Sequence, residues 1–514
     1  MADAPAVLLI HPPIAKGCEP PAGIARLAGA LRAAGISCRT FDANLEGQLW
    51  LLEHAPSAND TWTHRALKGR NEHLAALRTL ATYQSPDRYR RAVSDLNRLL
   101  GKAGESHGAT VGLADYQQAD LSPLSSADLL AAAAAPERSP FSPWFSARLP
   151  ERLRGVTVVG LSLNYLSQAL TTFAMAGLIR RLVPRVTIVL GGGLVTSWLR
   201  RPTWHNPFAG LIDHLVAGPG EEFLLTLCGG APPPAPTLPD YAGLPLDDYL
   251  APGLILPYSA AAGCWWNRCS FCPERAEGNA YFPLPAAQAV DELHALCTIY
   301  RPALVHLLDN ALSPALLRAL VARPLPAPWY GFARIDAQLA DPEFCRALRR
   351  AGCVMLKLGL ESGDQAVLDA LEKGVDLQQT GQALASLKAA GIAVYAYLLF
   401  GTPAEDEVAA RRTLDFVVRN DDAIGYLNLA LFNLPAGADD AGQHETEPFY
   451  AGDLSLYTGF RHPKGWERQK VRRFVSGEFS RHPAVAAILR RDPPLFTSNH
   501  APLFAMQGIN RTGH

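Results

Sequence analysis

Short apolar runs alternate with segments of helical periodicity in the first part of the chain. Ala6–Ile10 (AVLLI) has the character of a buried strand, and the helical spacing of residues 23–35 ends at a glycine, which commonly closes a helix. Two further strand-like runs, Val156–Leu163 and Val186–Gly193, flank another helical segment. This strand–helix–strand alternation predicts parallel pairing in an open α/β sheet.

A second rhythm begins at about residue 250. Six strand-like runs alternate with helical segments there, and this alternation predicts a parallel sheet curled into a partial (β/α)6 barrel. The chemistry of such barrels lies at the carboxyl ends of the strands. The six runs begin at Leu254, Ala303, Trp329, Val354, Ala393 and Gly425.

A proline-rich stretch, GGAPPPAPTLPDYAGLPLDDY, separates the two rhythms and is typical of a linker. Beyond the barrel, residues 461–491 hold nine Lys or Arg against two acidic residues, a pattern that fits a solvated helix face or a surface for an anionic substrate. The apolar, proline-broken stretch 492–505 is a candidate lid over the barrel mouth. We expect an N-terminal unit at 1–230 with a mostly helical insertion at about 50–150, a linker at 231–250, the barrel at 251–435, and a mostly helical extension at 436–514.

Composition narrows the classes of function. Hydrophobic residues make up 48% and charged residues 18% of the 514 positions, as in ordinary globular proteins, and the net charge of −1 creates no field for nucleic acid. No apolar run is long enough for a membrane span, and we see no signal peptide at the N-terminus. Nine mostly isolated cysteines do not form a disulfide framework, so we expect a reducing, cytoplasmic location.

One loop after the first barrel strand concentrates cysteines. Cys264, Cys269 and Cys272 fall within GCWWNRCSFCPE, and thiolates at such spacing bind zinc or iron–sulfur clusters. A structural zinc site needs a fourth ligand, for which His294 or His306 would have to come close. Three cysteines with no clear fourth ligand favour an iron–sulfur cluster that keeps one iron open. A structural zinc protein remains the alternative.

The N-terminal sheet has its own candidate site, because ligands bind at the carboxyl ends of strands in open α/β sheets. Those ends are Pro12-Pro13, Ser162 to Asn164, and the three glycines Gly191, Gly192 and Gly193, which allow close approach of a large ligand or merely form a tight turn. Residues 217–222 (AGPGEE) form another strand-end loop that opens a helix.

Taken in order, these stretches resemble the radical S-adenosylmethionine (SAM) superfamily, and the preceding unit resembles the Rossmann-like cobalamin-binding domain of its largest methylase class. The resemblance covers roughly residues 5–50 and 155–435. The sequence stretches that show the resemblance are LLIHPPIAKGCEPPAGIARLAGALRAAGISCRTFDAN, VVGLSLNY, VTIVLGGG, DHLVAGPGEEFLLTL, CSFCPE, LKLGLESGDQAVLDALEKG and LLFGTPAED. One departure is an extra residue between Cys264 and Cys269, relative to the family's usual C-x-x-x-C-x-x-C.

The resemblance implies specific ligands. Cys264, Cys269 and Cys272 would hold a [4Fe-4S] cluster whose free iron binds SAM. Residues implied to contact SAM are Phe271, Asp309, Asn310, Arg334, Glu361, Ser362, Gly401 and Pro403. Structural alternatives exist for several of them: Asp309-Asn310 or Glu361 as helix caps, and Arg334 in an ion pair with Asp336.

Cobalamin is the second implied cofactor. Its contacts would be Pro12, Pro13, Gly23, Ser162, Asn164, Gly191, Gly192, Gly193, Gly218 and Glu221. The D-x-H-x-x-G motif that supplies an axial histidine in many cobalamin proteins is absent, and members of the radical class often lack it. His11 lies at the first strand end, where it is either structural or close to the corrin.

With both cofactors, the resemblance implies radical methylation of an unactivated carbon or phosphorus of a small-molecule, peptide or lipid-type substrate. An electron donor such as flavodoxin or ferredoxin would be needed. Cyclisation or oxidation without net methylation is the alternative within the class. A non-catalytic cobalamin-binding sensor is the alternative outside it. A methylthiotransferase fits poorly, because Cys18, Cys38 and Cys228 are scattered.

Overall fold

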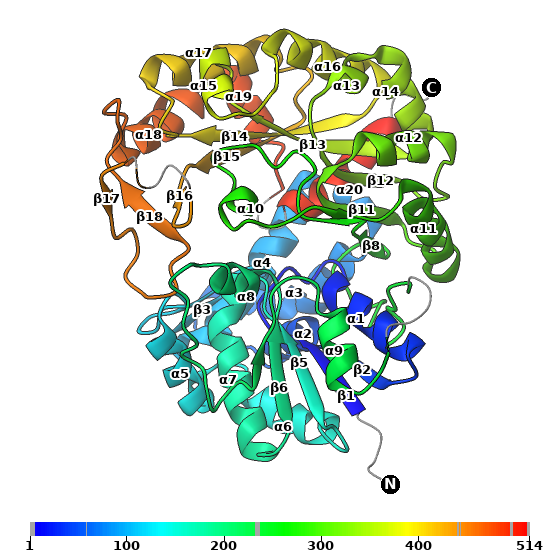
Figure 1. The fold of residues 1–514 in the computed structure, drawn as a ribbon, viewed down its shortest axis with the longest axis vertical. Helices are drawn as coiled ribbons and strands as arrows, with labels where there is room; N and C mark the ends of the chain where they lie inside the picture. The colour runs from blue at the N-terminus through cyan, green and yellow to red at the C-terminus, as the bar shows by residue number, and fades with distance from the viewer. Residues whose placement is uncertain are drawn as a thin grey trace. The chain divides into compact units, whose positions relative to one another are not determined.

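A computed structural model describes residues 6–57, 59–231, 237–438, 442, 444–493 and 497–510 of the chain. The chain forms two compact units, one up to Leu254 with Tyr450–Leu456, the other Ile255–Phe449 with the residues from Tyr457 onward (Figure 1). No helix in the described ranges is long and apolar enough to cross a membrane.

The N-terminal unit is built on a five-stranded parallel sheet in the order β2-β1-β5-β6-β7, which confirms the predicted open α/β sheet. Leu8, Leu9 and Ile10 of β1 are fully buried, as expected for a central parallel strand that is covered on both faces. Burying each such side chain contributes about 1.5–3 kcal/mol. The strands are β1 Ala6–His11, β2 Ser37–Asp42, β5 Val158–Ser162, β6 Thr187–Gly191 and β7 His214–Leu215, with helices α1 Ala22–Ala33, α7 Leu166–Leu182, α8 Gly193–Leu199 and α9 Glu221–Leu227.

The insertion is mostly helical, as expected, and adds a short hairpin that sequence analysis missed. The hairpin pairs strand β3 with β4 in antiparallel register. Its elements are α2 Ala43–Glu53, α3 Thr61–Leu77, α4 Pro86–Glu105, β3 Ala109–Val111, β4 Tyr116–Gln118, α5 Ser126–Ala134 and α6 Ser142–Arg152.

The described part of the expected linker is packed rather than extended. Asp240 N donates to Ala25 O at 2.9 Å, and Leu250 N donates to Gly17 O at 2.8 Å. The Tyr249 hydroxyl donates to the Asp42 carboxylate at 2.6 Å. Residues 237–254 therefore belong to the N-terminal unit, and residues 232–236 of the expected linker lie outside the described ranges.

The second unit carries the six predicted strands in one parallel sheet, in the order β15-β14-β13-β12-β11-β8. Figure 1 shows helices α12, α14, α16 and α17 along the outer side of this sheet. The strands are β8 Ile255–Tyr258, β11 Leu304–Leu312, β12 Trp329–Ala333, β13 Cys353–Glu361, β14 Ala393–Phe400 and β15 Tyr426–Leu431. The main helices are α11 Ala286–Tyr300, α12 Pro314–Ala322, α14 Pro342–Arg350, α15 Gln365–Ala370, α16 Leu377–Ala390 and α17 Glu407–Arg419.

Apart from Tyr450–Leu456, the C-terminal extension belongs to the same compact unit as the barrel. It begins with small antiparallel pairings before it becomes helical, a feature the sequence did not reveal. Its elements are β16 Leu434–Pro435, β17 Thr446–Glu447, β18 Tyr457–Phe460, α18 Arg468–Phe474, α19 Pro483–Leu489 and α20 Thr497–Asn510.

The residue just before the expected lid lies at the amino ends of the barrel strands, and the lid itself stays a prediction. Arg491 donates to the carbonyls of Ile424 at 2.9 Å and Gly425 at 3.2 Å. These carbonyls precede β15, at the amino ends of the strands, whereas the barrel mouth lies at the carboxyl ends. Residues 494–496 of the expected lid lie outside the described ranges.

Candidate functional site

The three cysteines lie on one loop between β9 (Ala261–Ala262) and α10 (Pro273–Ala276), beyond the carboxyl end of β8. All three are free thiols. Cys269 is 9% exposed, and Cys264 and Cys272 are partly buried. The loop therefore presents three thiols at the strand ends, where barrel enzymes carry their chemistry.

Burial disfavours the charged form of two of these thiols. It raises the pKa of Cys272 to about 11, although backbone amides at the start of α10 donate to the sulfur. Burial also raises the pKa of Cys269, which the neighbouring charges of Lys373 and Arg334 oppose. Binding metal at these positions must therefore release protons.

The loop is docked on the segment Leu371–Gly374, which follows α15. Ser270 N donates to Leu371 O at 3.1 Å, and the Trp266 indole donates to Glu372 O at 3.1 Å. Between Cys264 and Cys269, Asn267 has a left-handed φ of 45°, a conformation that Asn tolerates better than most residues. The loop is therefore anchored despite the unusual spacing of its cysteines.

Charged groups lie beside the thiols. Lys373 Nζ bonds Glu361 Oε1 at 2.8 Å, with side chains 9% and 12% exposed, and lies 5.6 Å from the Phe271 ring centre. Arg334 donates to the carbonyls of Lys373 and Gly374. Two cations and one carboxylate thus border the cysteine loop.

No ion pair joins Arg334 to Asp336 within the described ranges, although the Asp336 charge acts on Arg334. Asp336 caps helix α13 (Ala337–Ala340) by accepting from the amides of Gln338 and Leu339. Arg334 instead lies over the Trp266 ring of the cysteine loop, and its charge opposes the burial that raises the pKa of Cys269. The expected capping role of Glu361 is wrong, because Asp364 caps α15.

Asp309 and Asn310 diverge from each other at an irregularity in β11. The pairing of β11 with β12 jumps from Leu307 to Leu312 across these two residues, and such bulges redirect side chains. Asp309 is 3% exposed and accepts from Ala260 N at 3.1 Å, and burial raises its pKa to about 6. Its carboxyl group thus holds the backbone at Ala260, just before the cysteine loop.

Asn310 is exposed, and its side chain bonds Glu274 beyond the cysteines. Neither Asp309 nor Asn310 caps the next helix, because Ser313 does so by accepting from Leu316 N at 3.1 Å. Of the two residues, only Asn310 remains on the surface as expected for a SAM contact.

Glu361 and Ser362 also take different directions. Glu361 has a left-handed φ of 61° where the β13–β14 register shifts, which points to local backbone strain at the strand end. Ser362 is fully buried, and its hydroxyl lies 3.2 Å from Thr413 Oγ1. The predicted SAM contact of Ser362 is therefore not supported, because its side chain faces α17.

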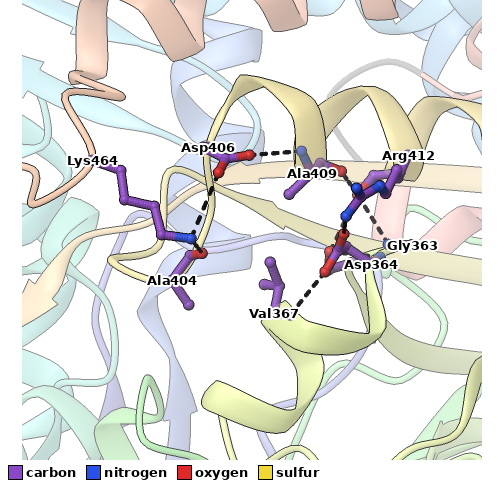
Figure 2. Close-up of polar contacts among 10 residues, drawn as sticks. Gly363, Asp364, Val367, Ala404, Asp406, Ala409, Arg412 and Lys464 are labelled. Carbon is purple, nitrogen blue, oxygen red and sulfur yellow. Dashed lines mark hydrogen bonds and ion pairs between the residues drawn. The ribbon is translucent and has the colours of Figure 1, made fainter.

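Polar contacts on that outer side fix the ends of β13 and β14. Figure 2 shows Asp364, which caps α15, in an ion pair with Arg412 of α17 at 2.5 Å. The same view shows Lys464 of the extension bonding Ala404 O and lying 3.7 Å from Asp406. The extension thus contacts the loop after β14.

That loop contains the predicted residues Gly401 and Pro403. Gly401 has a φ of +80°, and its amide donates to Glu405 Oε2 at 2.5 Å. Glu405 also accepts from the Trp466 indole at 3.0 Å, and His462 Nε2 donates to Thr402 O at 2.8 Å. The conformation of the loop therefore depends on the extension.

A cavity of about 110 Å³ opens between this loop and the extension. Its walls include Gly401, four phenylalanines and Trp466, with Arg468 and Glu467 among the polar lining residues. Arg468 lies 4.7 Å from the Phe449 ring centre. The cavity is a largely aromatic recess beside one of the predicted SAM-binding strand ends.

In the N-terminal unit, several predicted residues do meet at the carboxyl edge of the sheet. Asn164 accepts from Gly193 N at 3.0 Å and donates to Ser162 Oγ at 3.0 Å. A Cβ at Gly192, whose φ is +112°, would come within 2.4 Å of Leu163 O, so only glycine fits. A Cβ at Gly23 would lie 3.6 Å from Ser162 Oγ.

The remaining predicted residues of this edge are engaged differently. Gly218 has a left-handed φ of 71°, and its amide donates to Thr196. Glu221 is paired with Arg26 at 3.4 Å. Pro12 and Pro13 are buried, and their carbonyls accept from Gln168 and Thr171. The two prolines therefore fix the backbone after β1, and their side chains do not line the candidate site.

His11 is the last residue of β1, but its side chain is enclosed. It is 7% exposed, burial lowers its pKa, and its Nδ1 has no hydrogen-bond partner among the described residues. Such a neutral, enclosed imidazole supports the structural interpretation of His11 over a role as a ligand.

Sequence analysis missed Trp266, Lys373, Glu405 and Trp466. Lys373 follows Glu361 by twelve residues in a loop, and Trp466 is 61 residues from Glu405, so only the tertiary fold pairs them. The one available signal was the aromatic pair within the cysteine loop.

The positions of the possible metal ligands also bear on the alternative of a structural zinc site. No three His, Cys, Asp or Glu side chains within the described ranges are close enough to hold one metal ion. A structural zinc ion needs its ligands to converge on one point, whereas each cysteine of an iron–sulfur cluster binds a different iron. The arrangement fits a cluster better than a single ion.

Comparison with known proteins agrees with this geometry. Residues 258–417 match the family model of the radical SAM superfamily. The chain contains a radical SAM domain. This domain begins in β8 and ends in α17, so it includes the cysteine loop and the ends of β11 to β14.

Solved structures show a similar fold for nearly the whole chain. The methyltransferase TsrM from Kitasatospora setae, described as a radical SAM enzyme with cobalamin and a [4Fe-4S] cluster bound, superposes with a TM-score of 0.52 at 18% identity. The match covers 91% of this chain and 85% of TsrM. The fold, a parallel α/β unit followed by a radical SAM barrel, is thus shared.

Curated relatives match over shorter stretches. An uncharacterised methyltransferase of Pyrococcus horikoshii is 24% identical over 194 residues, covering 36% of this chain and 41% of the relative. An anaerobic magnesium-protoporphyrin IX monomethyl ester cyclase of Cereibacter sphaeroides is 25% identical over 276 residues, covering 45% and 44%. The chain spans less than half the length of either relative.

Proposed function

We propose that Cys264, Cys269 and Cys272 hold a [4Fe-4S] cluster and that SAM binds its open iron. The observation that carries this proposal is the loop itself: three free thiols on an anchored loop at the strand ends of a radical SAM domain, flanked by cationic side chains. When bound, the cluster supplies the electron that cleaves the S–C5′ bond of SAM.

The chain's own residues would orient SAM and keep out water. Phe271 and the Glu361–Lys373 pair lie beside the thiols, and Lys373 faces the aromatic ring. Gly401 has no side chain, so the backbone of its loop could approach SAM closely. Glu405 holds this loop by accepting from Gly401 N and from the Trp466 indole. A radical site must exclude other hydrogen donors, which the buried surroundings of these groups favour.

We further propose that the carboxyl edge of the N-terminal sheet binds cobalamin. Support comes from Ser162, Asn164 and Gly191–Gly193, which meet there, and from the shared fold with TsrM, whose structure holds cobalamin. When bound, cobalamin carries a methyl group. His11 is enclosed, so we expect no axial imidazole from that residue.

The reaction that fits both cofactors is methylation of an unactivated carbon or phosphorus, with an electron from a flavodoxin or ferredoxin. The methyltransferase among the relatives supports this choice. Cyclisation or oxidation without net methylation is the second candidate, supported by the cyclase relative. The substrate class remains a small molecule, peptide or lipid.

A SAM cleavage assay tests the radical step without knowledge of the substrate. Anaerobically reconstituted protein should release 5′-deoxyadenosine from SAM in the presence of dithionite. We expect Cys269→Ala to reduce that release at least a hundredfold, because the cluster loses a ligand. The control is Cys228→Ala, a buried cysteine of the N-terminal unit, which should retain wild-type release. Equal release from wild type and Cys269→Ala would contradict the proposal.

A further inference from the structure

Trp266 and Arg334 form a stacked pair beside the cysteine loop. The Arg334 guanidinium carbon lies 3.9 Å from the centre of the Trp266 ring, close enough for a strong cation–π contact. Trp265 meets Trp266 edge-on, with ring centres 6.1 Å apart and planes at 84°. Arg334 is only 8% exposed, so water screens its charge little.

Both partners are held by the segment Leu371–Gly374. The Trp266 indole donates to Glu372 O at 3.1 Å, and Arg334 donates to Lys373 O and Gly374 O. Gly374 has a φ of +62°, and a Cβ there would come within 2.3 Å of the Trp266 ring. The ring therefore has one position, directly over the guanidinium.

The contacts of Arg334 place its charge beside the cysteine loop. Its guanidinium donates to the two carbonyls and lies over the indole face, and its charge acts on the Cys269 and Cys264 thiols. A guanidinium occupied in this way is poorly placed to form a fork with a carboxylate of SAM. Its position instead suits a donor to a cluster-ligating sulfur.

We propose that Arg334 hydrogen-bonds the Cys269 sulfur and raises the reduction potential of the cluster, and that Trp266 is the positioning residue that fixes Arg334 there. This inference rests on the proposed cluster but assigns Arg334 a role different from SAM binding.

The direction of the effect follows from charge. Reduction adds one electron to the cluster, so a nearby fixed cation and a hydrogen bond to sulfur stabilise the reduced form. Removing the Arg334 charge should therefore lower the potential. Because the guanidinium is buried and lies beside the cysteine loop, we expect at least a tenfold change in the reduced-to-oxidised ratio.

A redox titration with dithionite, followed by electron paramagnetic resonance of the reduced cluster, tests the proposal on reconstituted full-length protein. At the wild-type midpoint, Arg334→Gln should decrease the reduced-to-oxidised ratio at least tenfold, a shift of about 59 mV for one electron. Trp266→Leu should decrease it in the same direction by a smaller factor. Trp266→Phe keeps a ring and should stay within twofold of wild type.

Arg268→Gln is the matched control. Arg268 lies 5.1 Å from the centre of the same indole ring but is exposed, so its removal should leave the potential within twofold. Iron content and SAM affinity are measured on every protein. Wild-type protein without iron would refute the proposed cluster itself.

Other results refute this inference alone. They are an unchanged potential in Arg334→Gln, or equal shifts in Arg334→Gln and Arg268→Gln. Weakened SAM binding at an unchanged potential would show that Arg334 contributes to SAM binding and does not tune the cluster. Should Arg334→Gln fail to bind iron, the Trp266→Leu and Trp266→Phe pair decides, because equal potentials in these two would refute a positioning role.

Discussion

At the scale of single residues, three carboxyl groups of the barrel unit have raised pKa values because they are shielded from solvent. Asp309, Glu405 and Asp492 are carboxyl groups whose pKa values burial raises to about 6, 7 and 7. Glu405 is the most enclosed, with no exposed surface, and it accepts from Gly401 N and the Trp466 indole. One group thus couples a strand-end loop to the extension.

Glu405 should make the barrel unit less stable as the pH rises. Its folded pKa of about 7 lies above the ordinary value of 4.5 for a glutamate, so the folded state binds the proton more tightly. Its stabilising contribution is complete below about pH 4.5 and is lost as the pH rises through about 7. The loss amounts to about 3 kcal/mol.

Thermal unfolding from pH 5 to 8 measures this effect as a difference between proteins. Glu405→Gln should lose less stability than wild type as the pH rises, while Asp309 and Asp492 still titrate. Glu407→Gln, which removes an exposed carboxylate of α17, should follow the wild-type curve. Parallel curves for Glu405→Gln and wild type would show that Glu405 does not titrate in this range.

At the scale of elements, the extension buttresses the loop after β14. His462, Lys464 and Trp466 contact successive residues of that loop, and Val471 lies against Gly401. This arrangement places the extension against a loop that is predicted to bind SAM. Its sequence showed only a basic bias, because the contacts span about sixty residues of chain.

Trp466→Leu should therefore weaken SAM binding as well as stability. The substitution removes the indole hydrogen bond at 3.0 Å and part of a buried side chain, which costs about 2–4 kcal/mol. SAM affinity, measured by calorimetry on reconstituted protein, should fall about tenfold. Trp62→Leu, at a position 61% exposed in α3, should change neither quantity. A destabilised Trp466→Leu protein with unchanged SAM affinity would separate the buttress from the SAM site.

The elements themselves were largely predictable from sequence. Apolar runs such as Ala6–Ile10 and Val354–Leu360 become buried parallel strands, because parallel sheets covered by helices need continuous apolar segments. The direction of side chains at strand ends was not predictable. Asp309 and Ser362 turn inward at a bulge and after a left-handed residue, and neither feature has a sequence signature here.

At the scale of the whole molecule, the chain combines two α/β units, each with a candidate site at the carboxyl ends of its parallel strands. In the radical SAM domain, thiols, cations and a strained Glu361 gather at those ends. In the N-terminal unit, glycines and the Ser162–Asn164 pair shape an open backbone edge. Two cofactors, one for each unit, are the simplest account of both sites.

The most direct test of this account is to quantify iron, cobalt and zinc in protein purified without oxygen from cells supplied with cobalamin. The account predicts about four iron atoms and about one cobalt per chain, with the matching visible spectrum. Replacing Cys264, Cys269 and Cys272 together by alanine should abolish the iron and leave the cobalt. Iron without cobalt would remove the basis for cobalamin-dependent methylation. Zinc in place of iron, persisting after reconstitution, would contradict the radical mechanism.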